Sequence, residues 1–279
     1  MLPFGIEYYR PDTIDEALKL YRRLRENHQE PVFYGGGTEL LTRARLQNVH
    51  FDAVIDLKNI PEVRVHGRSG DWLEFGAGLR LTDLADGNLW PLLTATADRI
   101  ADHTTRGQIT LGGNLLSTIP YREASLPFLL MDEAEALVAT EDGIESRPLA
   151  NLVSDSFIKP GEFLVSVRVK GDEAKGIAYR SRKMTRQDWI DYPLVTVAVT
   201  RRADGSLRAA FSGWAGFPFV SSAVNHILSD TGKSARRRAQ EAVAHMPVKA
   251  LEDLHGTREY REFVTEYTLA QIIDELEDD

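Results

Sequence analysis

Two glycine-rich segments carry the residues best suited to ligand chemistry in this sequence. The first is Tyr34-Gly-Gly-Gly-Thr-Glu-Leu40, and the second is Thr110-Leu-Gly-Gly-Asn114. Glycine permits a positive φ and lacks the β-carbon that would hold a ligand away from the main chain. Free backbone N–H groups at such a turn, together with the dipole of a following helix, favour an anion such as phosphate. Each segment is therefore a candidate phosphate-binding turn.

The residues around the first turn strengthen this prediction. Pro31-Val-Phe-Tyr34 predicts a buried strand, and residues 38–46 predict a helix, so the glycines lie between a strand and a helix start. A plain strand-to-helix connection is the alternative. The pattern Gly35-x-Gly37-x-x-Leu40 lacks the third glycine of a Rossmann fingerprint, and no Gly-Lys-Ser/Thr follows. A nicotinamide Rossmann site and a P-loop NTPase are therefore disfavoured.

The second segment lies within a stretch from Thr105 to Ser117 that is otherwise typical of a strand. Glycines inside a strand pattern indicate close approach of another backbone or a ligand. Asn114 supplies an amide, and Thr110 and Ser117 supply hydroxyl groups for hydrogen bonds. A tight hairpin at Gly112-Gly113 is the alternative.

Taken in order, these segments resemble the FAD-binding (medium) subunit of the molybdenum hydroxylase family, the xanthine dehydrogenase and carbon monoxide dehydrogenase group. Residues 35–40 match its Ala/Gly-Gly-Gly-Thr-Asp/Glu-Leu segment. Arg106 and residues 110–114 match part of its Ile-Arg-Asn-x-Ala-Thr-x-Gly-Gly-Asn segment. Further landmarks follow in the family's order at residues 54–57 with Ile60-Pro61, 75–84, 160–164, 183–186 with 191–195, and 255–261. Order and spacing together make the resemblance specific.

The resemblance implies a set of FAD-binding residues. The pyrophosphate would be wrapped by Phe33, Tyr34, Gly35, Gly36, Gly37, Thr38, Glu39 and Leu40. The flavin and its ribityl chain would be lined by Ile109, Thr110, Gly113, Asn114, Leu116 and Ser117. Glu123 would take the place of an acidic residue that contacts the ligand.

A basic contact is implied at Lys183. Arg182 and Arg186 are alternatives because the Lys-to-Arg spacing is one residue shorter than the family's, and a solvated basic strand edge is a third interpretation. The chain also departs from the family at Ile119-Pro-Tyr-Arg-Glu123, where small residues and Asp are common. There, Tyr121 and Arg122 would either narrow the pocket or meet the phosphates.

Composition limits the other functions. The chain has 279 residues, 43% hydrophobic and 27% charged, which suits two modest globular domains. A net charge of −9 and a pI near 5.4 disfavour a nucleic-acid binder. The seven histidines show no metal-ligand spacing, and no Gly-x-Ser-x-Gly elbow is present. We predict neither a catalytic side-chain constellation nor a metal site.

The sequence contains no cysteine. Iron–sulfur clusters are held by cysteine thiolates, so clusters would have to sit in another polypeptide. Disulfides and a cysteinyl flavin link are excluded, and the composition fits a reducing cytoplasm.

The first residues show neither a basic n-region nor a long apolar h-region, and no stretch approaches the roughly 18 apolar residues of a membrane span. We therefore expect a cytoplasmic protein that does not contact a membrane.

Periodicity predicts an α+β chain. A helix should begin after Thr13, because Thr13-Ile-Asp-Glu16 forms a capping box. Strands are expected at 31–34, 53–57, 72–76 and 135–140, with helices from Thr38 and over 89–101. Later strands are expected at 177–183, 194–202 and 207–213, followed by helices at 221–229, 234–245 and 259–276.

The domain prediction combines these elements with the resemblance. An FAD-binding domain at 1–172, with subdomains of about 1–58 and 59–172, would be of the vanillyl-alcohol-oxidase/PCMH type. A C-terminal domain at 173–279 would contain an antiparallel sheet plus helices, of the molybdenum hydroxylase flavoprotein type. The two glycine turns then fall in different subdomains, which places the dinucleotide in the cleft between them.

The expected function is that of an FAD-binding electron-transfer subunit. It would take electrons from an iron–sulfur partner subunit, work beside a molybdopterin subunit, and pass electrons to NAD or another acceptor. Purines such as xanthine are the first substrate class that the resemblance implies. A stand-alone flavin reductase or oxidase and an assembly module that has lost FAD are the alternatives.

Overall fold

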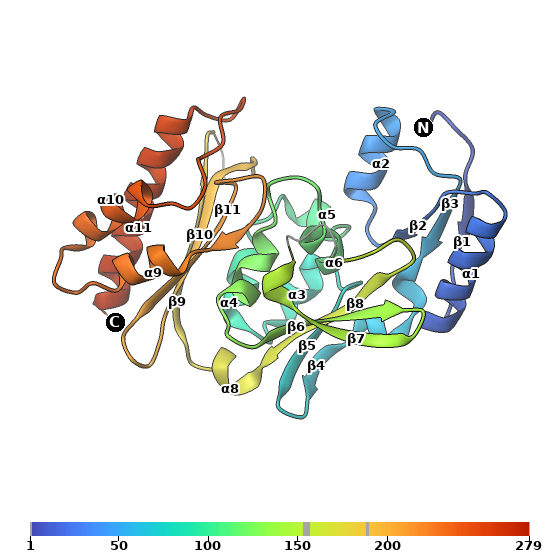
Figure 1. Ribbon diagram of the computed structural model, residues 1–279, viewed down its shortest axis with the longest axis horizontal. Helices are drawn as coiled ribbons and strands as arrows, with labels where there is room; N and C mark the ends of the chain where they lie inside the picture. The colour runs from blue at the N-terminus through green and yellow to red at the C-terminus, as the bar shows by residue number, and fades with distance from the viewer. Residues whose placement is uncertain (1, 153–156, 188–189, 279) are drawn as a thin grey trace. The chain divides into compact units, whose positions relative to one another are not determined.

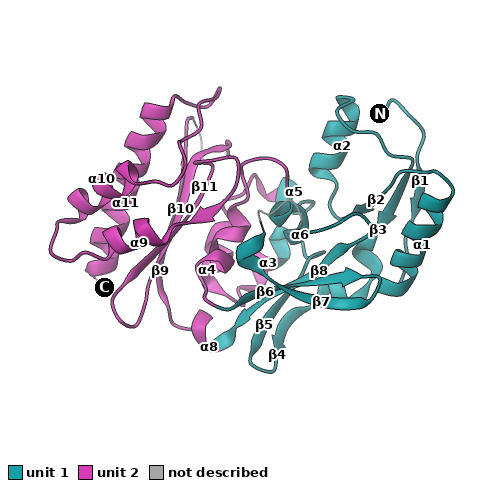
Figure 2. Cartoon of the chain, in the orientation of Figure 1, with its two compact units in different colours: residues 1–83, 104–116, 133–171 teal, residues 84–103, 117–132, 172–279 magenta. Residues whose placement is uncertain are grey.

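The computed structural model describes residues 2–152, 157–187 and 190–278. The chain forms two compact units (Figure 2). Unit 1 contains residues 1–83, 104–116 and 133–171, and unit 2 contains residues 84–103, 117–132 and 172–279. Both glycine segments thus belong to unit 1. The domain boundaries expected from the sequence follow chain order instead and stay a prediction.

Unit 1 begins with a three-stranded parallel sheet between two helices (Figure 1). Successive side chains of a strand point to opposite faces of the sheet, so neighbouring residues of β3 pack against different helices. Ile55 packs in the same cluster as Ala17 of α1, whereas Val54 packs with Ala44 of α2. The strand order is β1-β3-β2. The elements are β1 (Glu7–Tyr9), α1 (Ile14–Glu26), β2 (Pro31–Tyr34), α2 (Thr38–Arg45) and β3 (Ala53–Asp56).

The predicted cap of α1 is present in part. Thr13 Oγ1 accepts a hydrogen bond from the Glu16 N–H at 3.2 Å. The Glu16 carboxylate accepts from the backbone of Asp12 at 2.9 Å, one residue before the position that a full capping box uses. The cap therefore fixes the helix start with a shifted reciprocal bond.

A second, antiparallel sheet completes unit 1, with strand order β4-β5-β8-β6-β7. Phe163 and Ala139 of this sheet pack in one cluster with Ile55 and Ala17, so a single core joins both sheets of the unit. The strands are β4 (His66–Ser69), β5 (Trp72–Gly76), β6 (Ala134–Thr140), β7 (Gly143–Pro148) and β8 (Phe163–Lys170). Short helical segments are η1 (Leu57–Asn59), η2 (Pro61–Arg64), α5 (His103–Arg106), α6 (Leu111–Leu115) and η4 (Leu149–Asn151). The helix α3 (Leu81–Gly87) begins in unit 1 and ends in unit 2.

Unit 2 contains an antiparallel four-stranded sheet with order β12-β11-β10-β9. Val197 and Phe211 of the sheet pack in one buried cluster with Leu269 and Ile273 of α11. The strands are β9 (Ala178–Thr185), β10 (Pro193–Arg201), β11 (Leu207–Ser212) and β12 (Phe219–Val220). The helical elements are α4 (Pro91–Ala97), η3 (Glu123–Ser125), α7 (Leu126–Leu129), α8 (Gly171–Ala174), α9 (Ser222–Leu228), α10 (Ala235–Ala244) and α11 (Arg258–Glu277).

Most predicted elements lie within a few residues of their expected bounds, but α4 is shorter. The helix expected over 89–101 begins at Pro91 and ends at Ala97. Proline suits the first turn of a helix, where its missing N–H is not needed. Ala101 has a φ of +50°, which is outside the helical region. Among the described residues, no helix has the length and apolar character to cross a membrane.

Candidate functional site

The first glycine turn follows β2 at the carboxyl edge of the parallel sheet, the edge where open α/β sheets bind ligands. Gly37 caps α2 with a φ of +71°, and a side chain there would overlap the ring of Tyr34. Within the described part of the chain, the N–H groups of Gly36, Gly37 and Thr38 have no hydrogen-bond acceptor. The turn therefore presents consecutive backbone donors at a helix start, as an anion requires.

The second glycine segment is a short helix, so the strand expected there is wrong. Thr110 caps α6, and its Oγ1 accepts a hydrogen bond from the Gly113 N–H at 3.2 Å. Gly112 donates its N–H to the carbonyl of Ala77 at 2.8 Å, and a Cβ on Gly112 would lie 2.8 Å from the Ala77 Cβ. The threonine cap and the packing of Gly112 on Ala77, the residue after β5, thus stabilise a helix despite the strand-like composition.

The two glycine segments lie against each other in unit 1. A Cβ on Gly36 would overlap the carbonyl oxygen of Gln108, and a Cβ on Gly35 would lie 2.7 Å from Thr110 Oγ1. Only glycine lets the two backbones approach this closely. The segments therefore form one continuous surface of main chain, which we call the glycine cradle (residues 35–38 and 108–114).

Side chains near the first turn divide into core and surface residues. The ring of Phe33 lies 5.0 Å from that of Tyr21 and 4.8 Å from that of Phe163, so this side chain belongs to the core. Leu40 packs in the cluster beneath α2. Glu39 pairs with Arg43 at 3.8 Å on the same helix. Of this predicted group, the glycines and Thr38 offer main-chain contacts to a ligand.

The residues predicted around the second segment lie in both units. Ile109 accepts the Leu81 N–H at 3.0 Å, and Asn114 is buried within α6. Leu116 is half-buried at the end of the 104–116 segment of unit 1. Ser117 begins a segment of unit 2, and its Oγ accepts a hydrogen bond from the Ile119 N–H at 3.2 Å.

Glu123 and Lys183 are electrostatically coupled within unit 2. The Glu123 side chain is buried, and its Oε2 has no hydrogen-bond partner among the described residues. Burial raises the pKa of Glu123, while the positive charge of Lys183 opposes this rise. Lys183 Nζ donates to the Arg99 carbonyl at 3.0 Å. A buried carboxyl oxygen without a partner is a group that a polar ligand can satisfy.

The two alternatives to Lys183 have other contacts. Arg182 pairs with Glu275 of α11, and Arg186 donates to the Leu254 carbonyl at 2.9 Å. Neither arginine contributes to the charge environment of Glu123. Of the three basic residues, Lys183 is therefore the one whose charge acts on Glu123, and its contact with the cofactor stays a prediction.

Tyr121 belongs to an aromatic cluster of unit 2. Its ring stacks on that of Tyr192 with centroids 4.7 Å apart, and His255 meets both rings edge-on at 5.9 Å. Arg122 donates its N–H to Ser212 Oγ at 2.9 Å. At Tyr121, the departure from the family pattern therefore supplies aromatic packing within unit 2.

The sequence prediction missed three residues beside the first turn. Lys58 Nζ donates to the Gly35 carbonyl at 2.8 Å and to Asp56 Oδ1 at 2.8 Å. Tyr8 donates its hydroxyl to the other carboxylate oxygen of Asp56 at 2.5 Å. The position of Asp56 could have indicated its role. It is the last residue of a strand that pairs in parallel with β2, and ligand sites form at the carboxyl ends of such strands.

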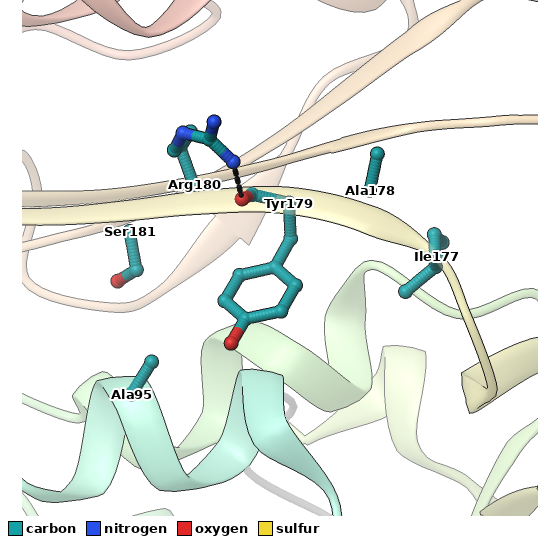
Figure 3. A pocket seen from close by; sticks show the side chains of 6 residues that line it. All are labelled: Ala95, Ile177, Ala178, Tyr179, Arg180 and Ser181. Carbon is teal, nitrogen blue, oxygen red and sulfur yellow. Dashed lines mark hydrogen bonds between the residues drawn. The ribbon is translucent and has the colours of Figure 1, made fainter. Parts of the chain in front are cut away.

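A pocket of about 470 Å³ lies between α4 and the edge strand β9 in unit 2. Figure 3 shows the side chains of Tyr179 and Ser181 on the side of β9 that faces Ala95, while Arg180 extends from the opposite side. The pocket is lined by Ala95, Ile177, Ala178, Tyr179, Arg180 and Ser181. None of the predicted FAD-binding residues lines it. The pocket is therefore separate from the predicted cofactor residues.

The geometry suits a phosphate-bearing cofactor. The glycine cradle combines free backbone donors with positions that only glycine can occupy. Within residues 2–152, 157–187 and 190–278, no group of three or more histidine, cysteine or acidic residues could hold a metal ion. The fold and this site are those of a protein suited to a phosphate-bearing ligand and lacking the Rossmann fingerprint.

Comparison with known proteins identifies the family. Residues 3–169 match the family described as the FAD binding domain in molybdopterin dehydrogenase, and the chain belongs to this family. The carbon monoxide dehydrogenase medium chain of Hydrogenophaga pseudoflava is 25% identical over 276 residues, covering 94% of this chain and 93% of that protein. The xanthine dehydrogenase FAD-binding subunit of Escherichia coli O157:H7 is 24% identical over 216 residues, covering 73% and 72%. The predicted resemblance is confirmed, and the chain is an FAD-binding oxidoreductase flavoprotein.

Solved structures support the predicted fold class. Carbon monoxide dehydrogenase from Hydrogenophaga pseudoflava, lacking the Mo-pyranopterin moiety, aligns with a TM-score of 0.86 at 23% identity, covering 98% of both chains. Quinoline 2-oxidoreductase from Pseudomonas putida 86 aligns with a TM-score of 0.84 at 20% identity, covering 99% of this chain and 98% of that chain. At these identities the likeness concerns the fold, and it confirms the α+β class.

Proposed function

We propose that this chain is the electron-transfer flavoprotein subunit of a molybdenum hydroxylase-type complex. The observation that carries the proposal is the family match over residues 3–169, and the contact between Gly36 and Gln108 supports it by joining two glycine segments into one main-chain surface. Family membership supplies the cofactor, FAD. When bound, FAD can accept electrons one at a time and deliver two with a proton as hydride, which links single-electron clusters to a nicotinamide acceptor.

The predicted site residues have different roles in binding FAD. The N–H groups of Gly36, Gly37 and Thr38 bind the pyrophosphate. Thr110 and Asn114 orient the ribityl and flavin portions, together with Ile109, Gly113, Leu116 and Ser117. Glu123 and Lys183 supply a carboxyl group and a cation, and the unpaired Oε2 of Glu123 supports a polar contact there.

The partners follow from the relatives and from the composition. The sequence has no cysteine, so iron–sulfur clusters would be bound by a partner subunit. We propose a molybdopterin subunit as the site of substrate oxidation, and NAD as the acceptor. Relatives named for carbon monoxide and for xanthine match at 25% and 24% identity. We propose a purine substrate, a role in purine catabolism and a cytoplasmic location.

Anaerobic visible spectroscopy of the chain reconstituted with FAD tests this function. We expect bound flavin whose absorbance bleaches when NADH is added. Bound flavin that ignores NADH would reject NAD as the acceptor while keeping FAD binding. Rapid turnover of a small substrate without any partner would instead support a stand-alone reductase or oxidase. A chain that binds no FAD would overturn the proposal.

A further inference from the structure

The ammonium group of Lys58 forms a network of contacts beside the first glycine turn. Lys58 Nζ lies 2.8 Å from the Gly35 carbonyl oxygen, and 2.8 and 2.9 Å from the two carboxylate oxygens of Asp56. It also lies 4.4 Å from the ring centroid of Tyr34. All these residues belong to unit 1. One ammonium group thus contacts the turn, the strand before it and the strand beside it.

Because the peptide group is planar, a contact that holds its carbonyl also fixes the direction of its N–H group. In such a peptide the C=O and N–H groups point in opposite directions. Because the Gly35 carbonyl is held by Lys58, the Gly36 N–H of the same peptide must point away from Lys58. The Gly36 carbonyl accepts the Tyr34 hydroxyl at 3.4 Å, which directs the Gly37 N–H away from Tyr34 in the same manner.

The charge on Lys58 is already balanced. Asp56 is 3% exposed, and it accepts hydrogen bonds from the Lys58 ammonium, the Lys58 backbone and the Tyr8 hydroxyl. The Asp56–Lys58 pair is neutral as a unit, so it contributes orientation more than net positive potential. Asp56 holds the ammonium group, and the ammonium group holds the turn.

We propose that Lys58, anchored by Asp56, is a positioning residue that sets the peptide planes of the glycine turn so that consecutive N–H groups face a bound pyrophosphate. This inference rests on the proposed function, because it takes the FAD pyrophosphate as the ligand of that turn. The ligand class is any compound that carries this diphosphate, which includes ADP as well as FAD. Riboflavin lacks the phosphates and does not use the positioned donors.

Lys58→Met separates this role from general damage to the fold. It removes the ammonium group but keeps an unbranched side chain. Lys19→Met is the matched control, because Lys19 also pairs with an aspartate of unit 1 but its side chain is 70% exposed. Binding of FAD, ADP and riboflavin would be measured by titration calorimetry at low and high salt, with the melting temperature of each apo protein.

We expect Lys58→Met to weaken FAD and ADP binding by about tenfold or more, as the loss of a charge-assisted hydrogen bond does. Riboflavin binding and the Lys19→Met protein should match the wild type. The loss should persist at high salt, because a misoriented turn is not corrected by screening. Unchanged FAD and ADP affinity in Lys58→Met, or an equal loss for riboflavin, would overturn the inference.

Tyr34→Phe provides a second test if Lys58→Met does not fold. It keeps the ring under Lys58 but removes the hydroxyl that contacts the Gly36 carbonyl. We expect FAD and ADP binding to fall by a few fold with riboflavin unchanged, and unchanged affinity for all three ligands contradicts the inference. A wild-type chain that binds no FAD would reject the proposed function itself. Wild-type binding with no effect of either variant would reject only the role of Lys58.

Discussion

Gly36 faces the backbone carbonyl of Gln108 so closely that a single β-carbon on Gly36 would overlap the oxygen. The two residues are far apart in the sequence and adjacent in unit 1. Their contact brings the turn after β2 beside the segment that leads into α6. The shape of the proposed cofactor surface therefore depends on the absence of one methyl group.

Substitution Gly36→Ala tests this contact. We expect it to destabilise the fold by about 1–3 kcal/mol, because the added carbon meets backbone that cannot rotate away. FAD retention should be lost with it. Gly67→Ala is the control, since a Cβ on Gly67 would meet nothing within 4 Å. Chemical denaturation and the visible absorbance of the purified proteins measure both effects, and a yellow, fully stable Gly36→Ala protein would contradict the proposed cradle.

The cap of α6 can be removed without adding bulk. Thr110→Val deletes the Oγ1 that accepts the Gly113 N–H, and we expect a loss of about 1 kcal/mol in unfolding free energy. Flavin affinity should fall as well, because α6 carries Asn114. Thr110→Ser retains the hydroxyl and should keep both properties near wild type. Equal behaviour of the valine and serine variants in urea titrations would show that the cap is unimportant.

Asp56 should make the apo protein sensitive to acid. Burial raises the pKa of Asp56, but the hydrogen bonds from Lys58 and Tyr8 outweigh burial and hold it below its ordinary value of 3.8. Its contribution to stability is present above that ordinary value and is lost as pH falls through the folded-state pKa. Asp56→Asn should cost about 1–3 kcal/mol at neutral pH. Denaturant titrations across pH should show the wild-type advantage vanish in acid, and a constant difference would argue against an ionised Asp56.

Glu123 should have the opposite pH dependence. Burial raises its pKa above the ordinary 4.5, so the folded apo chain keeps a proton that the unfolded chain releases. Stability should therefore fall as pH rises above 4.5 toward the folded-state pKa. Glu123→Gln removes this slope and should raise the melting temperature at neutral pH, by about 2–4 °C for each kcal/mol recovered.

The control for that experiment is Glu252→Gln, at an exposed position of unit 2. It should leave both the melting temperature and its pH dependence unchanged. FAD affinity gives an independent result, since Glu123→Gln should weaken binding if the carboxyl oxygen contacts the cofactor. A Glu123→Gln protein with the wild-type pH profile would show that the buried carboxyl does not titrate as inferred.

Arg261 is predicted to be a structural anchor of unit 2. Its fully buried guanidinium donates to the carbonyls of Gly213 at 2.8 Å and Leu251 at 3.1 Å, and pairs with Asp253 at 2.9 Å. Arg261→Met removes these donors from two buried carbonyls and breaks the ion pair with Asp253, and it should cost about 3–5 kcal/mol. The exposed Arg237, which pairs with Glu241 on α10, provides the control Arg237→Met with a cost of about 0.5 kcal/mol. Similar denaturation midpoints for the two variants would contradict the anchoring role.

The sequence by itself determined the local features of this protein. Pro31 to Tyr34 form a strand, Thr13 begins a helix, and the glycines of the first turn precede α2, as predicted. These features depend on residues close together in the chain, through strand propensity, capping and the conformational freedom of glycine. The order of the same motifs also identified the family, which the match over residues 3–169 confirms.

Tertiary structure alone decided which distant residues act together. The contact of Gly36 with Gln108, the bond from Lys58 to Gly35 and the coupling of buried Glu123 to Lys183 all join separate segments. Local pattern was also misleading at residues 110–114, where a threonine cap and packing on Ala77 produced a helix instead of a strand. The reason is physical: burial, charge pairing and close backbone approach depend on packing between segments, and sequence spacing does not encode those distances.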